Sequence, residues 1–319
     1  MARGVDDSIA RYGDSGYATM ADLEELLIKT SRTFTLSIPL LPEPTRQEVT
    51  IAYLLFRIAD TFEDAAQWPQ QQRIETLHQF ARLLREPLIE EARRWTSRWV
   101  LEPPCGHEGH LELLSETPQV LQAFFALSEK AHDIIREHII RTAEGMAGFV
   151  ARTTDAGMLR LQGILDLQEY CYVVAGIVGE MLTELFLLGR DYLQPIASFL
   201  RKRASRFGEA LQVVNILKDS ADDAKEGRYY LPEDIDRGEI FALARDDLST
   251  AGSYVLALQE AVAPRGLVAF TALPVQLAWA TLDRVEKLGP GSKLTRKEVF
   301  QIIEKLERAL DRNRPAVAC

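Results

Sequence analysis

Two stretches of the sequence repeat one spacing of polar residues that suits metal binding. The first stretch places four polar residues at offsets of 0, 4, 7 and 11: Tyr53, Arg57, Asp60 and Asp64. At about 100° per residue, these offsets fall on one stripe of a helix. The residues between them are mainly apolar, and a helix of that kind is normally buried. Because burying charged groups is costly unless they are paired or bind metal, the stripe predicts a functional site.

The second stretch repeats this geometry. Its polar residues stand at offsets of 0, 3, 7 and 11: Gln212, Asn215, Asp219 and Asp223. Each stretch therefore holds an Asp-x-x-x-Asp pair whose Cα atoms lie about 6 Å apart along a helix axis. One such pair is common on a solvated helix face, where its role is structural. Two pairs on otherwise apolar helices, each with polar residues upstream, favour a functional interpretation.

Carboxylates one helical turn apart are suited to Mg²⁺, which binds a few carboxylates together with water and substrate phosphate oxygens. Two such helix faces opposite each other would hold a diphosphate between metal ions. Cations near the motifs would bind the same phosphates: Arg57, Lys218 and Arg228. The two stretches therefore predict a site for magnesium and a diphosphate.

Composition limits the class of protein further. The chain has 319 residues, 47% hydrophobic and 26% charged, which is typical of a soluble globular protein. Its 37 Lys and Arg against 47 Asp and Glu give a net charge of −10, which argues against general nucleic-acid binding. The N-terminus carries no secretory signal. The cysteines are odd in number and far apart, so we expect a reducing cytoplasm rather than a disulfide framework: Cys105, Cys171 and Cys319.

We expect no membrane-spanning segment. The most apolar stretch, residues 173–188, contains Glu180 and Glu184, and a span needs about 20 apolar residues. Peripheral contact with a membrane stays open, and so does the oligomeric state.

The elements that must position the two motifs are expected to be helices throughout. No Asn-Gly, Asp-Gly or Gly-Gly hairpin signal occurs, and no long run alternates with period two. Prolines and glycines divide the pattern, and we expect helices over 45–64, 73–86, 119–146, a long segment ending near Asp223, and 296–311. The prediction is one all-α domain over residues 1–319, with a flexible segment at 1–20, a tail at 312–319 and most long helices around one central space.

Three further segments accompany the aspartate motifs: Ser31-Arg32-Thr33-Phe34, Tyr170 to Gly179, and Leu211 to Pro232. Together these segments resemble the squalene/phytoene synthase family, and the likeness runs over about residues 30–295. The resemblance implies the all-α isoprenoid-synthase fold, a helical bundle whose central active-site cavity is lined by both aspartate helices.

The resemblance implies a prenyltransferase that condenses two farnesyl diphosphates head to head, through presqualene diphosphate, to squalene with NADPH. Asp60-Thr-Phe-Glu-Asp64 and residues 270–282 are similar to the squalene enzymes. Gly179-Glu180 and Gly208-Glu209 resemble the bacterial dehydrosqualene and phytoene enzymes instead. One alternative is therefore the same fold giving presqualene diphosphate, dehydrosqualene or phytoene without reduction. A second alternative is a non-catalytic helical scaffold.

The resemblance also assigns roles to single residues. The magnesium ligands would be Asp60, Asp64, Asn215, Asp219 and Asp223. The catalytic groups would be the four aspartates with Tyr53 and Tyr170, and Tyr170 would guide a proton loss. The substrate contacts would be Ser31, Arg32, Thr33, Tyr53, Arg57, Gln212, Lys218 and Arg228. Residues 227–230 would form a flap over the metals. The structural alternatives are a core tyrosine at 170, a helix cap at 31–33 and a surface loop at 227–230.

The implied cofactors are Mg²⁺ and NADPH. No Gly-x-Gly-x-x-Gly fingerprint occurs, so any NADPH site is not a dinucleotide-binding fold. The implied partner is farnesyl diphosphate. The expected setting is the cytoplasm without a transmembrane segment, and peripheral association with a membrane stays open.

Overall fold

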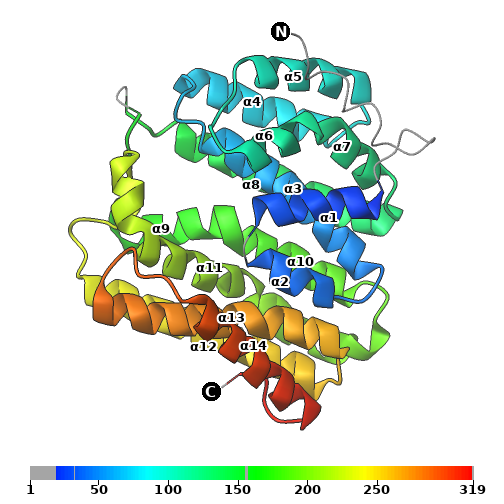
Figure 1. Cartoon of the computed structure of the whole chain (residues 1–319), viewed down its shortest axis with the longest axis vertical. Helices are drawn as coiled ribbons and strands as arrows, with labels where there is room; N and C mark the ends of the chain where they lie inside the picture. Colours follow the sequence, from blue (N-terminus) through cyan, green and yellow to red (C-terminus); the bar gives the residue numbers. More distant parts are fainter. Residues whose placement is uncertain (1–18, 32, 155–156, 318–319) are drawn as a thin grey trace.

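The computed structural model describes residues 19–31, 33–154 and 157–317, and most of these are helical (Figure 1). The α-helices are α1 Met20–Thr30, α2 Phe34–Ser37, α3 Thr45–Glu63, α4 Gln70–Leu83, α5 Ile89–Leu101, α6 Glu108–Ser115, α7 Thr117–Phe125, α8 Glu129–Val150, α9 Gly163–Cys171, α10 Ile177–Leu187, α11 Gln194–Lys225, α12 Arg237–Glu260, α13 Arg265–Leu288 and α14 Arg296–Asp311. A π-helical turn, Tyr172–Gly176, joins α9 to α10, and single 3₁₀ turns lie at Ile38–Leu40 and Asp191–Leu193. The expected all-α architecture is confirmed.

The helices form layers with the long helix α11 between them. In Figure 1, α4 to α7 lie at the top, α12 to α14 lie at the bottom, and α3, α8, α10 and α11 lie between. Helix α11 packs on α10, α12 and α13, while α3 packs on α8 and α4. The two predicted aspartate stretches therefore lie on separate helices in the middle of the bundle.

The prediction of a single helix over residues 119–146 is wrong. Residues 119–146 divide into α7 and α8, because the chain turns at residues 126–128 and Ser128 starts a new helix. The Ser128 side chain accepts a hydrogen bond from the Ala131 amide, which caps the first turn of α8. No glycine or proline marks this break, so the pattern of apolar residues runs through it.

A two-residue parallel ladder is the strand structure in the described part of the chain. β1, Leu159–Arg160, pairs with β2, Arg228–Tyr229. Such short strands carry no period-two pattern that a sequence could reveal. The ladder matters because it attaches the segment after α11 to the segment before α9.

Glycines let α11 approach the helix that carries Tyr170. A Cβ on Gly208 would lie 1.9 Å from the Ala175 carbonyl oxygen, and one on Gly179 would lie 2.0 Å from the Ala204 carbonyl oxygen. No side chain fits at such distances, so the backbones of α10 and α11 touch directly. This contact fixes the second aspartate stretch against the Tyr170 helix.

Two helical segments, Gly163–Leu187 and Arg265–Leu288, are long and apolar enough to cross a membrane by length and composition. Core helices of soluble proteins pass the same test, so the expectation that no segment spans a membrane stays a prediction. More than half of each apolar window is buried within the bundle. Glu180 and Glu184 form ion pairs with Arg141 and Arg201, so the first segment is built into the protein as a core helix.

The C-terminal segment follows the bundle closely. Ala316 and Val317 are buried, and the Gln276 side chain donates to the Ala316 carbonyl. Gln259 accepts from the Ala316 amide and donates to the Arg314 carbonyl. The expected tail thus packs on α12 and α13 as far as residue 317, while most of the expected flexible segment at 1–20 lies outside the described residues.

Candidate active site

Helix α3 carries the first aspartate stretch as the predicted stripe. The Arg57 guanidinium lies 3.2 Å from a carboxylate oxygen of Asp60 and donates to the Tyr53 hydroxyl at 3.3 Å. The Tyr53 hydroxyl in turn donates to the Thr30 carbonyl at 2.9 Å. Burial raises the pKa of Asp60 to about 6, although Arg57 opposes the shift. The stripe is thus a connected polar row on a helix whose other faces are apolar.

Asp64 ends α3 and points away from it. It is the C-cap residue of the helix, and its side chain is 51% exposed. Phe62, packed between Trp68 and Trp99, anchors the last turn of α3 in the core. The aspartate therefore projects from a rigid helix end.

Helix α11 carries the second aspartate stretch in the same way. The Lys218 ammonium contacts both the Asn215 amide oxygen and the Asp219 carboxylate at 3.1 Å. Burial raises the pKa of Asp223 to about 6, and the neighbouring Asp219 adds to this shift. Gln212, one turn before this group, is half-buried.

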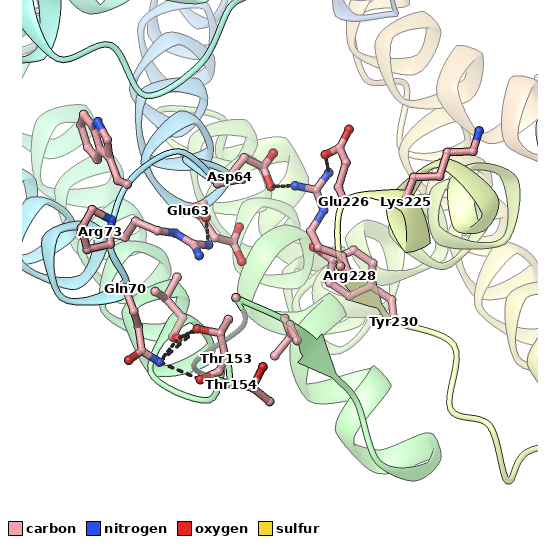
Figure 2. Close-up of a pocket in the computed structure, with 17 residues that line it drawn as sticks. Glu63, Asp64, Gln70, Arg73, Thr153, Thr154, Lys225, Glu226, Arg228 and Tyr230 are labelled. Atoms are coloured by element: carbon pink, nitrogen blue, oxygen red, sulfur yellow. Dashed lines mark hydrogen bonds and ion pairs between the residues drawn. The ribbon is translucent and has the colours of Figure 1, made fainter.

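Arg228 joins the two aspartate stretches. Its guanidinium lies 3.0 Å from Asp64 and 3.7 Å from Asp223, and it also pairs with Glu226. Figure 2 shows Arg228 reaching from the segment after α11 toward Asp64 at the end of α3. One side chain thus holds the last carboxylate of each motif at a common place.

The carboxylates suit a metal that shares its ligands with a substrate. Among the described residues, no group of three or more His, Cys, Asp or Glu side chains is arranged to hold a metal ion by itself. The donors come instead as a pair on each helix, joined through Arg228. An oxygen-only set of this kind fits Mg²⁺, which keeps waters and takes phosphate oxygens as further ligands. The ligand set remains a prediction.

Tyr170 is buried and hydrogen-bonded to a second tyrosine. Its hydroxyl donates to the Tyr230 hydroxyl at 2.9 Å, and the two rings stack with centroids 4.6 Å apart. Phe149 meets the Tyr170 ring edge-on at 5.1 Å. Burial raises the pKa of both tyrosines well above the ordinary value, and the nearby Glu63 carboxylate adds to each shift.

A cavity of about 760 Å³ lies between the ends of α3 and α11 and the loops after α8. It is lined by Glu63, Arg73, Gln70, Arg228 and Tyr230, among others (Figure 2). Burial and the neighbouring Asp64 and Asp60 raise the pKa of Glu63 well above its ordinary value.

Three residues that line the cavity were not expected from the sequence: Glu63, Gln70 and Arg73. Glu63 stands between Asp60 and Asp64 in the first motif. This position is the one feature of the sequence that could have indicated a role for Glu63 in the site. Arg73 donates to the Glu63 backbone carbonyl, and Gln70 binds the carbonyls at the end of α8. These contacts join residues of different helices, so no pattern of neighbouring residues in the sequence predicts them.

Ser31 contacts the first turn of α2 through its side chain. The Ser31 hydroxyl accepts from the Phe34 amide at 3.0 Å, which is the structural alternative expected for it. Thr33 precedes α2 and makes no capping hydrogen bond with its side chain. Arg32 lies outside the described residues, and the substrate contacts predicted for 31–33 stay predictions.

Comparison with known proteins identifies relatives over most of the chain. A family model described as squalene/phytoene synthase matches residues 27–251. The Botryococcus squalene synthase of Botryococcus braunii is 28% identical over 214 residues, covering 66% of this chain and 42% of that protein. The squalene synthase of Rattus norvegicus is 31% identical over 209 residues, covering 66% and 45%. The chain therefore spans less than half the length of these relatives.

Solved structures share the fold. A complex of TcSQS with the ligand E5700 is 26% identical, with a TM-score of 0.72, and the match covers 91% of this chain and 87% of that one. A dehydrosqualene synthase in complex with a ligand is 22% identical, with a TM-score of 0.56, covering 92% and 96%. The helical bundle expected from the resemblance is therefore confirmed.

Proposed function

The chain belongs to the squalene/phytoene synthase family, and from this premise we propose that it is a magnesium-dependent prenyltransferase acting on farnesyl diphosphate. It joins two farnesyl diphosphates head to head through presqualene diphosphate, and it reduces this intermediate to squalene with NADPH. The observation that supports the proposal is the Arg228 bridge, because one guanidinium contacts the last aspartate of each motif, Asp64 and Asp223.

The donor set supports a magnesium role in this proposal. The ions would be held by the oxygen donors of the two helices: Asp60, Asp64, Asn215, Asp219 and Asp223. Bound Mg²⁺ neutralises the charge that develops on a departing diphosphate. The absence of a three-carboxylate cluster among the described residues agrees with ions that need the substrate to complete their ligand sets.

The cations of the site bind and orient the diphosphates. The Arg57 guanidinium donates to the Tyr53 hydroxyl and pairs with the Asp60 carboxylate. These two contacts hold it in position without substrate. Lys218 contacts both Asn215 and Asp219 on α11. Preorganised positive groups of this kind stabilise a leaving diphosphate without reorganising during the reaction.

Tyr170 supports the proton loss in the proposed reaction. Departure of one diphosphate leaves an allylic cation, which the double bond of the second farnesyl group attacks. Loss of a proton then closes the cyclopropane ring of presqualene diphosphate. Tyr170 carries a buried hydroxyl that is hydrogen-bonded to Tyr230 and packed edge-on against Phe149.

The fit to NADPH rests on cations at the edge of the second aspartate helix. The loop after α13 contacts this helix, since the Gly291 amide donates to the Lys218 carbonyl at 2.7 Å. Lys293, Arg296 and Lys297 follow in the loop and the first turn of α14, and all three side chains are exposed. These cations would hold the phosphates of NADPH, which supplies the hydride for the second half-reaction.

The experiment is incubation with farnesyl diphosphate and Mg²⁺, with and without NADPH, followed by chromatography of the extracted products. We expect presqualene diphosphate without NADPH and squalene with it, and no turnover in the presence of a chelator. A C30 hydrocarbon that stays unreduced with NADPH would assign dehydrosqualene synthesis, and conversion of geranylgeranyl diphosphate alone would assign phytoene synthesis. A folded protein that converts neither substrate would contradict the enzyme proposal and support the alternative of a non-catalytic helical scaffold.

Asp219→Asn tests the metal-binding wall directly. We expect turnover to fall by at least about 100-fold, because removing a group that stabilises developing charge has effects of this size. Asp222→Asn is the matched control, since Asp222 lies on the same helix, pairs with Lys225 and is 57% exposed. Equal turnover of the two variants would contradict the assignment of Asp219.

A further inference from the structure

The Tyr170–Tyr230 pair has a direction. Tyr170 is the donor in the hydrogen bond between the two hydroxyls, and Tyr230 is the acceptor. The proton of the Tyr230 hydroxyl has no acceptor among the described residues. A buried hydroxyl normally finds a partner for its proton, and the cavity that Tyr230 lines can hold water as that partner.

Tyr230 supplies the link between Tyr170 and the 760 Å³ cavity. Tyr230 lines that cavity, whereas Tyr170 does not. Tyr170 is 3% exposed and Tyr230 is 7% exposed. Figure 2 shows Tyr230 at the cavity wall below Arg228. The pair therefore forms a short row of hydroxyls that runs from the buried Tyr170 to a polar cavity large enough for water.

The backbone holds Tyr230 in this place. The β1–β2 ladder fixes the residues just before it, through bonds from Leu159 N to the Gly227 carbonyl and from Leu161 N to the Tyr229 carbonyl. Gly227 has a φ of +77°, a conformation that glycine adopts without strain. The sharp change of direction after α11 and the ladder together place the Tyr230 ring flat against Tyr170.

A single buried tyrosine is a poor final acceptor for a proton. Accepting the proton from a carbocation leaves a positively charged hydroxyl unless the residue releases its own proton at once. Releasing it first leaves a buried phenolate, which burial disfavours. A second hydroxyl in hydrogen-bond contact removes both difficulties, because one proton enters the row as another leaves it.

We propose that Tyr230 is a positioning and relay residue that carries the proton lost during cyclopropane closure from Tyr170 to water in the cavity. The proposal rests on the proposed function. The C–H bond of the cationic intermediate breaks, and its electron pair forms the third C–C bond of the ring. The proton goes to the Tyr170 oxygen, the Tyr170 proton goes to the Tyr230 oxygen, and the Tyr230 proton goes to a cavity water. Both tyrosines are neutral before and after the step.

Tyr230→Phe tests the relay, since it removes the hydroxyl and keeps the stacked ring. We expect kcat for presqualene diphosphate formation to fall at least tenfold, with an unchanged KM, because positioned proton transfer contributes about 10²- to 10⁴-fold. Tyr254→Phe is the matched control, because Tyr254 is also buried and its hydroxyl makes a 2.9 Å bond to Thr183. The control should retain wild-type kcat.

A second readout separates a relay from a structural role. Single-turnover rates in mixtures of H₂O and D₂O should curve with the deuterium fraction in the wild type, because several protons move together, and should become linear in Tyr230→Phe. The wild-type measurement needs no variant, so it stands even where Tyr230→Phe fails to fold. A linear dependence in the wild type, or a Tyr230→Phe variant with wild-type kcat, overturns the relay alone. A wild type that does not convert farnesyl diphosphate overturns the relay together with the proposed function.

Discussion

Single charged residues set the electrostatics of the site, and Arg228 pairs with more of its carboxylates than Arg57 or Lys218 does. Its guanidinium contacts carboxylates from the end of α3, from α11 and from the loop that follows. An ordinary pairwise ion pair at a surface contributes little, but this side chain is 20% exposed and shared by three acids. It therefore keeps the three carboxylates together in this structure.

Glu209 gives a prediction on pH at the same scale. Burial against α10 and the neighbouring Asp247 raise the pKa of Glu209 to about 7, and the groups that face it include Ser205, Arg206 and Glu180. The folded protein therefore binds an extra proton between about pH 4.5 and pH 7. The stability that this proton gives is fully present below about pH 4.5 and is lost as pH rises through about 7.

Glu209→Gln should remove this loss. We expect the variant to be more stable than wild type at pH 8 by about 3 kcal/mol, and the difference to vanish near pH 4. Denaturant unfolding at the two pH values measures it. A difference that is constant with pH would show that Glu209 ionises normally in the folded protein.

The packing of helices sets the distances within the site, and α11 lies in direct backbone contact with the segment that runs from the π-helical turn into α10. The π-helical turn at Tyr172–Gly176 adds a residue to the helix that follows Tyr170, and such turns are frequent at functional sites. Gly208 lies against this turn with no room for a side chain. The position of Asp219 and Asp223 along α11 therefore depends on backbone packing more than one turn away.

Gly208→Ala should destabilise the protein by about 2 to 4 kcal/mol, because overpacking against backbone forces the helices apart. Gly148→Ala in α8 is the control, since a Cβ there has no neighbour within 4 Å. The control should be neutral or stabilising by up to about 1 kcal/mol. Thermal unfolding of both variants checks this, and similar melting temperatures would contradict the close packing.

At the scale of the whole molecule, the contacts that join the two aspartate motifs in the folded protein are also those of the proposed binding site. Because the folded protein brings the two motifs together, Mg²⁺ with pyrophosphate should bind the folded form and raise its melting temperature. A ligand at 100 times its Kd adds about 2.7 kcal/mol to the free energy of unfolding. Asp219→Asn should show no rise, and a chelator should reverse the rise in wild type. Scanning calorimetry measures this, and an equal rise in Asp219→Asn would count against the site.

Much of this molecule could be predicted from local pattern. The two polar stripes, the long helices and the fold class follow from the 3.6-residue period and from proline and glycine positions. The Tyr170–Tyr230 pair could not be predicted, because its members are 60 residues apart in the chain. The break between α7 and α8 was also missed, since a lone serine cap is a weaker signal than the apolar pattern around it.

The bridge between Arg228 and Asp64 joins positions 164 residues apart. During synthesis, α3 with its aspartates leaves the ribosome long before Arg228 has been added to the chain. Catalytic competence therefore appears late, once α11 and the short ladder have emerged. Ribosome-arrested chains of increasing length would acquire pyrophosphate binding in one step, after residue 228 has left the exit tunnel.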